Sequence, residues 1–230
     1  MKNVAFIRGG LGLQTLEYMA VNYLAHTSNK KIDQIYLSVG RNENALHEQL
    51  SINWLKKLFI VDFAILFVDS LAKQAIWKNP DLFKAMVSSI DEIRPNLKNK
   101  VHAHDRPLLH VRSGDRSVST IQRFVSLGEK FGRDLVIVGN DKKTNTEIIK
   151  QLGFGEDISA DAVSDWRAIV GAPTLGAAFS SFSVSAMLFD IKKEYLFIEP
   201  RGEENKEVTH NEKQIMNFLI NNIFINGKTI

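Results

Sequence analysis

Residues 135–139 read Leu-Val-Ile-Val-Gly, an uninterrupted apolar run that ends at a glycine. Such a run, without polar alternation, is typical of a strand buried on both faces of a parallel sheet. The next residues carry helix signals, because Thr144 and Glu147 match a capping box and Gly153 is placed to end the helix. A strand followed directly by a helix is the repeating unit of an α/β fold.

The same alternation of apolar strand runs and helical periodicity extends along the chain in both directions from this strand. Further strands are predicted over residues 4–7, 35–39, 64–68, 108–111, 175–179 and 195–198. Helices are predicted after Gly12, after Ser119 (with Gln122 as a capping box), over 162–170 and 182–190, and from about Asn211 to Phe224 with Thr209 and Glu212 at its start.

A polar stretch with two prolines, residues 94–107, divides this alternation into two series. We therefore predict an α/β protein of two Rossmann-like lobes with parallel sheets and a central cleft. The N-terminal lobe covers residues 1–100 and the C-terminal lobe covers residues 101–208. Residues 209–230 form a C-terminal helix that packs back across the lobes, because its apolar stripe from Ile215 to Ile223 needs a partner surface.

The composition excludes several classes of function. Of 230 residues, 44% are hydrophobic and 24% charged, and the net charge of +3 is spread along the chain, unlike the concentrated basic face of nucleic-acid binders. The absence of cysteine excludes disulfides and thiolate chemistry. The apolar stretch from Leu58 to Val68 is interrupted by Asp62 and too short to span a bilayer, and no signal-peptide layout is present. We expect a cytoplasmic protein with no transmembrane segment.

The first candidate site is Arg8-Gly9-Gly10-Leu11-Gly12, between the first predicted strand and helix. Glycines at this position allow a backbone to approach a ligand at a positively polarised helix N-terminus. The dinucleotide fingerprint G-x-G-x-x-G is not matched, because Thr15 stands where the third glycine belongs, and no Walker lysine follows. A ligand loop and an ordinary tight turn both fit this segment.

The second candidate is His110-Val111-Arg112-Ser113-Gly114-Asp115, at the carboxyl end of the strand that opens the second lobe. Ligands of open α/β sheets bind outside the carboxyl ends of the strands. An arginine, a glycine and an aspartate there suit an anion site with an acid beside it. An Arg112–Asp115 ion pair that braces the turn is the alternative.

The third candidate is the serine-rich segment Ser180-Ser181-Phe182-Ser183, where a small-residue strand leads into a helix. Hydroxyls and backbone N–H groups at a helix start can hold phosphate oxygens. A serine N-cap without any ligand explains the same residues.

Together the three segments resemble the fucosyltransferase superfamily, in particular the bacterial α-1,2-fucosyltransferases. Their Gly-Gly-Leu-Gly-Asn-Gln loop resembles residues 9–14, their H-x-R-R-x-D motif resembles residues 110–115, and their Ser-Ser-Phe-Ser element resembles residues 180–183. A Ser- and Asp-rich loop of the family has its counterpart in Gly139-Asn140-Asp141. The chain departs from the family at Leu13, Glu17 and Ser113, which replace Asn, Gln and the second Arg.

The resemblance implies a two-lobed GT-B fold and an inverting, metal-independent transfer of a sugar, fucose from GDP-fucose being favoured, to a glycan or glycolipid that can be lipid-linked. A lipid-linked acceptor would bring the enzyme to a membrane surface. Arg112 would stabilise the departing diphosphate, because a guanidinium matches phosphate oxygens. Asp115 and Glu17 are the candidate bases. The donor would be bound by His110, Arg112, Gly114, Asn140, Asp141, Ser180, Ser181, Phe182 and Ser183. The cleft would be lined from the first lobe by Arg8, Gly9, Gly10, Gly12 and Gln14.

Two other readings fit the same residues: a GT-B transferase with a different nucleotide sugar, and a catalytically inactive nucleotide- or glycan-binding module. A metal site is the weaker interpretation of His102, His104 and Asp105 near His110, because the full ligand pattern of dinuclear hydrolases is absent. We expect no metal and no cofactor. Trp54, Trp77 and Trp166 are expected in the core or in a groove.

Overall fold

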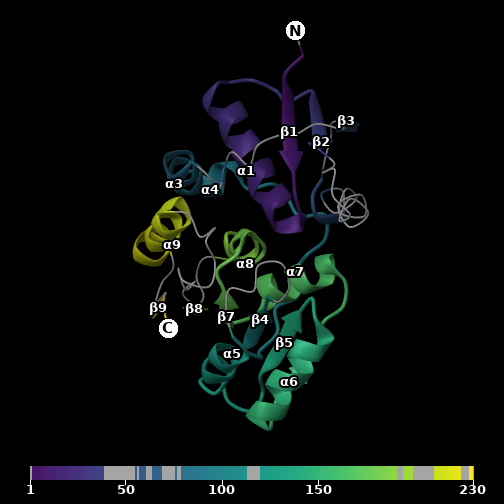
Figure 1. Cartoon of the computed structure of the whole chain (residues 1–230). Helices are drawn as coiled ribbons and strands as arrows, with labels where there is room; N and C mark the ends of the chain where they lie inside the picture. The colour runs from purple at the N-terminus through teal and green to yellow at the C-terminus, as the bar shows by residue number, and fades with distance from the viewer. Residues whose placement is uncertain are drawn as a thin grey trace. The chain divides into compact units, whose positions relative to one another are not determined.

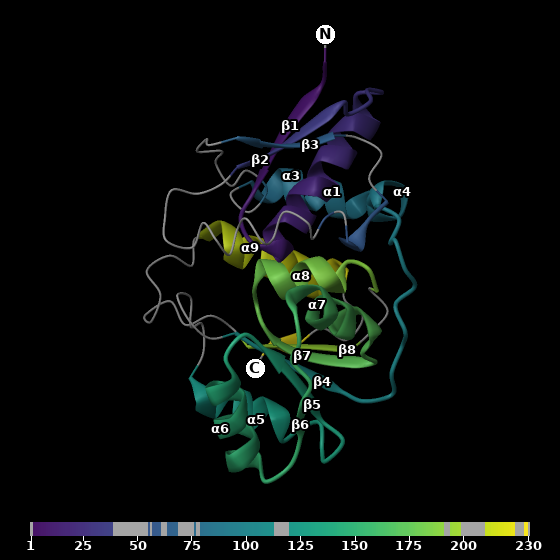
Figure 2. The ribbon, with the colours of Figure 1, turned by 90° about the vertical axis from the view of Figure 1, so that its right-hand side faces the viewer.

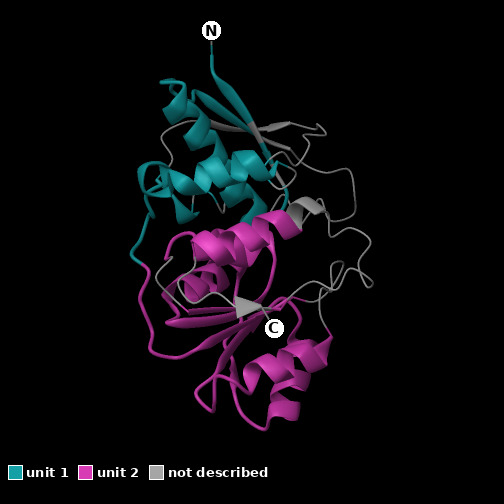
Figure 3. Ribbon diagram, turned by 90° about the vertical axis from the view of Figure 1, so that its left-hand side faces the viewer, with its two compact units in different colours: residues 1–100 teal, residues 101–230 magenta. Residues whose placement is uncertain are grey.

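The structure, a computed structural model, describes residues 2–38, 55, 57–60, 64–68, 76, 79–112, 120–190, 194–198, 210–223 and 228–229. The chain divides into two compact units, residues 1–100 and 101–230 (Figures 1 and 3). Each unit contains a parallel β-sheet with helices packed on it. The predicted α/β class with parallel sheets in Rossmann-like lobes is therefore confirmed. The central cleft and the packing of the last helix across the lobes stay predictions.

Unit 1 is built on a three-stranded parallel sheet of order β1-β2-β3. Its strands are β1 (Val4–Arg8), β2 (Gln34–Ser38) and β3 (Ala64–Val68). Helix α1 (Leu11–Thr27) connects β1 to β2, packs on β1 and contacts α3 (Pro80–Ser88) and α4 (Ile90–Ile93). Helix α3 begins where Asn79 accepts a hydrogen bond from the N–H of Leu82, with proline at the first helical position.

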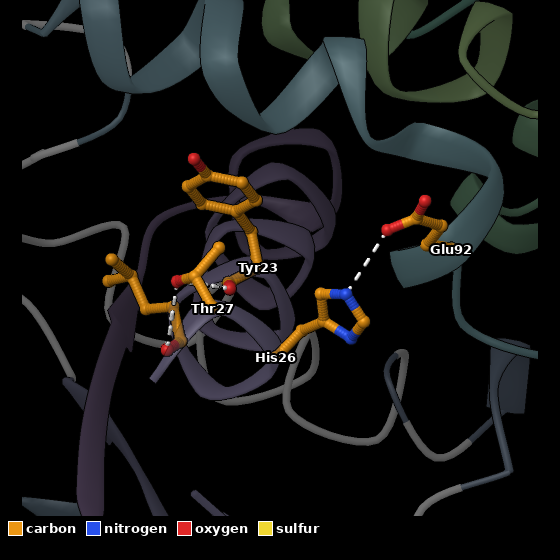
Figure 4. Close-up of polar contacts among 5 residues, drawn as sticks. Tyr23, His26, Thr27 and Glu92 are labelled. Carbon is orange, nitrogen blue, oxygen red and sulfur yellow. Dashed lines mark hydrogen bonds and ion pairs between the residues drawn. The ribbon is translucent and has the colours of Figure 1, made fainter. Parts of the chain in front are cut away.

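The core of unit 1 centres on α1. Every residue from 11 to 20 is buried, so this half of the helix has no solvent-facing stripe. At its other end the helix is exposed, and His26 Nε2 lies 3.1 Å from Glu92 Oε2 of α4 (Figure 4). Figure 4 also shows the hydroxyl of Thr27 donating to the carbonyl of Tyr23 in the last turn. An ion pair this exposed contributes little, about 0–1 kcal/mol.

Unit 2 carries a six-stranded parallel sheet of order β6-β5-β4-β7-β8-β9 (Figure 2). Its strands are β4 (Leu108–Val111), β5 (Val136–Gly139), β6 (Glu156–Asp157), β7 (Thr174–Ala178), β8 (Glu194–Ile198) and β9 (Lys228–Thr229). Its helices are α5 (Ile121–Gly128), α6 (Lys142–Leu152), α7 (Ala162–Gly171), α8 (Ser181–Met187) and α9 (His210–Asn222). Counted from β4, this is the 3-2-1-4-5-6 strand order of a Rossmann sheet.

The two faces of this sheet are covered by different helices, α5 and α6 on one and α7 and α8 on the other (Figure 2). Leu109 and Val111 of β4 belong to the core cluster with α5 and α6. The first face is closely packed at β7, because a Cβ on Gly176 would lie 2.6 Å from the ring of Phe131. Since side chains alternate along a strand, His110 belongs to the second face, where its ring stacks on Phe182 of α8.

Several predicted boundaries differ from the structure. Helix α6 is capped by Asp141 rather than Thr144, although Gly153 ends it with a φ of 72°, as predicted. The N-cap of α5 is Thr120 and not Ser119, which lies outside the described residues. The last helix runs over His210–Asn222, close to the predicted span. Strands β6 and β9 were not predicted, because each has only two residues and shows no periodic pattern.

No helix within the described ranges is long and apolar enough to cross a membrane.

Candidate functional site

The strand order of unit 2 singles out one position on its sheet. The chain passes from β4 to β5 and β6 on one side of β4, and then returns to β7 on the other side. In open α/β sheets ligands bind at this switch point, outside the carboxyl ends of the strands. Here those ends lead into Arg112 after β4 and into Phe179 and Ser180 after β7. The topology thus places Arg112 of the second predicted segment and Ser180 of the third at the same edge.

His110 is the most unusual residue at this edge. It is only 6% exposed, and its ring lies 5.2 Å from that of Phe182, at an interplanar angle of 29°. Burial, and after it the nearby Arg112 cation, lowers the pKa of His110 to about 3, so the ring is neutral near pH 7. Its Nδ1 is buried, and none of the described residues forms a hydrogen bond with it. A buried polar group left unsatisfied typically costs about 1–3 kcal/mol.

Arg112 directly follows β4 and is half-buried. Its charge is close enough to His110 to influence the pKa of that ring. Ser113, Gly114 and Asp115 lie outside the described residues, so the predicted roles of Gly114 and Asp115 stay predictions. The ion pair between Arg112 and Asp115 stays open as the alternative.

The serines after β7 form a capping box at the start of α8. Ser180 Oγ accepts from the N–H of Ser183 at 3.2 Å, and Ser183 Oγ accepts from the N–H of Ser180 at the same distance. Ser183 Oγ also donates to the carbonyl of Ala178 at 2.9 Å. Both serines are buried, so the N-cap interpretation accounts for their hydroxyls, while Ser181 and Phe182 are half-buried.

The turn after β5 presents Asn140 and Asp141. Asn140 is exposed, whereas Asp141 caps α6 by accepting from the N–H of Lys143 at 3.0 Å and from the Thr144 hydroxyl at 2.6 Å. These bonds, the Thr144 hydroxyl first, lower the pKa of Asp141. Both carboxylate oxygens of Asp141 therefore accept hydrogen bonds from the first turn of α6. Asn140, before it, is exposed.

Sequence reasoning missed a partly buried polar network beside this turn. Asp157 Oδ1 accepts from the Ser159 hydroxyl at 2.5 Å and from Asn145 Nδ2 at 3.2 Å. Ser159 Oγ accepts in turn from the N–H of Gly139 at 2.9 Å. The spacing Asp-x-Ser is a local turn signal, but nothing in the sequence connects it to Gly139, which lies 20 residues upstream.

The glycine loop of unit 1 is shaped by its own packing. Gly9 has a φ of 87°, and a Cβ there would lie 2.8 Å from Leu13 Cδ2. Gln14 reaches back so that its Nε2 donates to the carbonyl of Gly9 at 2.8 Å. Gly10 differs, because it is exposed, has an ordinary φ of −72° and would have nothing within 4 Å of an added Cβ. As the N-cap of α1 it supplies no side-chain cap.

The other unit 1 candidates are buried or not described. Gly12 and Gln14 belong to the buried half of α1, and Glu17 is only 6% exposed. Arg8 ends β1 beside Ser38 of β2, and its side chain is not among the described ones.

The two histidines ahead of β4 differ, because His104 is half-buried and contacts α7, whereas His102 is exposed. His104 Nε2 lies 3.2 Å from the carbonyl of Ala168, and the N–H of His104 donates to Gly171. In the part of the chain that the structure describes, no group of three or more His, Cys, Asp or Glu side chains could hold a metal ion. Trp166 is a core residue as predicted, fully buried and donating to the Ser185 hydroxyl at 3.0 Å, whereas Trp54 and Trp77 lie outside the described residues.

Fold and site together define an α/β protein with a Rossmann-order sheet and a candidate ligand edge at the carboxyl ends of β4 and β7. No protein-family model and no curated protein sequence matches the chain. Solved structures do resemble it. E. coli heptosyltransferase WaaC with ADP has a TM-score of 0.49 at 9% identity, with 95% of this chain and 97% of that chain covered.

The E. coli ADP-heptose lps heptosyltransferase II has a TM-score of 0.48 at 9% identity, covering 100% of this chain and 90% of that chain. The iron-containing dodecameric glycosyltransferase TibC from enterotoxigenic E. coli has a TM-score of 0.46 at 10% identity, covering 86% of this chain and 58% of that chain. These likenesses are too distant to carry an argument about activity.

Proposed function

We propose that the chain is a glycosyltransferase that binds a nucleoside diphosphate sugar at the carboxyl ends of β4 and β7. One observation carries the proposal: buried, neutral His110 lies beside the Arg112 cation at the switch point of a Rossmann-order sheet, and its Nδ1 has no partner within the described part of the chain. A neutral imidazole has one donor and one acceptor nitrogen, and a ligand with phosphate and hydroxyl groups can satisfy either.

In the proposed reaction, the bond between the sugar and the diphosphate breaks while the acceptor hydroxyl attacks the anomeric carbon. Negative charge then grows on the departing diphosphate, and the Arg112 guanidinium stabilises it with two parallel donors. An inverting transfer also needs a base for the acceptor proton, and we assign this role to Asp115 or Glu17. Unit 1 would hold the acceptor, a glycan or a glycolipid.

GDP-fucose is the donor that we propose, because three motif segments resemble the fucosyltransferases in the same order along the chain. One contact favours a second candidate, a transferase with another nucleotide sugar. Leu13 replaces the family's Asn, and its apolar side chain lies against Gly9, so this loop has no amide at that position.

Thermal shift with a panel of nucleotides tests this function. GDP and GDP-fucose should stabilise the protein more than UDP, ADP, CMP or NAD, by about 2.7 kcal/mol at 100 times the Kd. A stronger effect of UDP- or ADP-sugars would move the donor to the second candidate, and stabilisation by NAD alone would contradict the proposal. Release of GDP from the donor without acceptor, measured by chromatography, separates an enzyme from an inactive binding module.

We also propose that the reaction needs no metal, since Arg112 supplies the positive charge at the diphosphate. Transfer should therefore persist in EDTA. Loss of activity in EDTA with rescue by Mn²⁺ or Mg²⁺ would show that a metal, and not Arg112, neutralises the leaving group.

A further inference from the structure

The hydroxyl of Ser159 is held in one orientation by three partners. It donates its only proton to Asp157 Oδ1 at 2.5 Å, which also accepts the N–H of Ser159 at 3.0 Å. Its oxygen accepts from Asn145 Nδ2 at 3.1 Å and from the N–H of Gly139 at 2.9 Å. A serine hydroxyl has one donor and two acceptor sites, so this hydroxyl is fully satisfied.

The bond to Gly139 replaces a missing strand partner. Strand β6 pairs with β5 only as far as Asp157 opposite Ile137, and Ile158 makes the last backbone bond, to the carbonyl of Ile137. Gly139 is buried and lies two residues beyond that pairing. Its N–H would lack a partner on this side without the Ser159 hydroxyl, and buried N–H groups are rarely left unpaired.

Close packing holds Gly139 from two other directions. A Cβ at this position would lie 2.7 Å from Asn145 Oδ1 of α6 and 2.7 Å from the carbonyl oxygen of Val111 in β4. Asn145 itself is fully buried. Three elements therefore determine where β5 ends and where the next residue, Asn140, begins.

We propose that Ser159 is a positioning residue, which through Gly139 fixes Asn140 for contact with the nucleoside half of the donor. The second strand of a Rossmann sheet, here β5, ends beside the ribose of a bound nucleotide. The acid at this end, Asp141, caps α6, and Asn140 is the exposed residue that directly follows β5. This inference rests on the proposed function and concerns donor affinity, not the chemistry at Arg112.

The test compares Ser159→Ala with Ser159→Thr, which keeps the hydroxyl. Ser164→Ala is the matched control, because Ser164 also donates to a carboxylate, Asp161 Oδ2 at 2.8 Å, but does not contact Gly139. For Ser159→Ala we expect the donor KM to rise about tenfold with little change in kcat, since lost preorganisation weakens binding. Ser159→Thr should recover most of the affinity, and Ser164→Ala should bind like the wild type.

Amide hydrogen exchange over residues 136–141 provides a readout that needs no activity. Ser159→Ala should accelerate exchange at Gly139, and Ser164→Ala should not. An unchanged donor KM with a lowered melting temperature would make Ser159 a scaffold residue and overturn the proposal. Unchanged exchange at Gly139 would overturn the positioning step whatever the enzyme does. If the wild type binds no nucleotide sugar, the proposed function fails first and the donor role of Asn140 fails with it.

Discussion

The glycine loop of unit 1 and the β4 edge of unit 2 are both strand ends that carry motif residues, yet their residues are explained differently. Gly9 is required by its positive φ and by contact with Leu13, and Gln14 is used to hold Gly9. In unit 2, His110 Nδ1 has no hydrogen-bond partner among the residues that the structure describes. Motif residues thus fall into two groups, those that shape the backbone and those with a polar atom that no described residue satisfies.

The largest effect is expected for Arg112→Ala, which tests this distinction together with Arg112→Lys. Removing a preorganised donor from a developing charge typically lowers the rate about 100- to 1,000-fold, and lysine keeps the charge without the planar fork. We expect both variants to be badly impaired in sugar transfer while folding normally. Steady-state transfer, donor affinity and melting temperature should be measured together, with exposed Arg133→Ala as the control. If both variants bind and transfer normally, Arg112 belongs to the scaffold.

Gly9→Ala and Gly10→Ala test, within the glycine loop, which of the two glycines shapes the backbone. Alanine at Gly9 would have to adopt a φ of 87° and would place its Cβ against the Leu13 side chain. Backbone strain of this kind costs about 1–3 kcal/mol. Alanine at Gly10 has free space, so its stability should change by about 0.5 kcal/mol or less. Urea unfolding measures both. Equal destabilisation would show that Gly10 also shapes the backbone.

In unit 2, His110→Phe separates a ligand-binding role of His110 from a structural role. Phenylalanine keeps the stacking on Phe182 and removes Nδ1, which no described residue satisfies, so the free energy of unfolding should not fall. Nucleotide affinity should weaken about tenfold, the value of one typical hydrogen bond. Calorimetric titration with GDP measures the affinity. A destabilised variant with unchanged affinity would place His110 among the structural residues.

The substitution His110→Phe should also change how the stability of the protein depends on pH. The folded-state pKa of His110, about 3, lies below its ordinary value of 6.5. The neutral ring therefore contributes stability above pH 6.5, and this contribution is lost as the pH falls toward 3. Between pH 7 and pH 4, the free energy of unfolding, taken from unfolding curves at each pH, should decrease less for His110→Phe than for the wild type.

Asp165→Asn gives the smallest expected effect and concerns a charge outside the motifs. Burial raises the pKa of Asp165 from 3.8 to about 6, and Ala160 N–H donates to its Oδ1 at 2.8 Å. Because the folded-state pKa is raised, stability declines as the pH rises from about 4 to 6. Asparagine keeps the acceptor without the charge. We expect a gain of about 1 kcal/mol or less at pH 7, reduced by the partial exposure of the carboxyl, and no gain at pH 4.

Much of the fold was predictable because apolar runs directly report buried strands. The run at 135–139 became β5, and Gly153 ends α6 in the left-handed conformation that glycine favours. The two-residue strands were not predictable, because their pairing depends on neighbours and not on their own pattern. Likewise, helical periodicity predicted α1, but it did not indicate that every residue from 11 to 20 is buried.

The candidate site was only partly predictable for a related reason. The motif at 110–115 indicated a site at a strand end, and the sheet order now brings residues 110 and 182 together. Whether the Ser180 and Asp141 oxygens are available depends on local capping geometry, which a single sequence leaves open. The link from Ser159 to Gly139 joins two strand ends, and a single sequence shows no trace of such a contact.

The pairing of β4 with β7 also sets the order in which the chain can fold. Leu108 lies beside Leu175, so this contact spans all of α5, β5, α6, β6 and α7. Contacts that close long loops have a high entropic barrier and form late, whereas β4 and β5 can pair across a shorter connection. His110 and Phe182 therefore meet only after the intervening segments are made and docked. During synthesis on a ribosome, the nascent chain would already hold part of its sheet while the ligand edge had not yet formed.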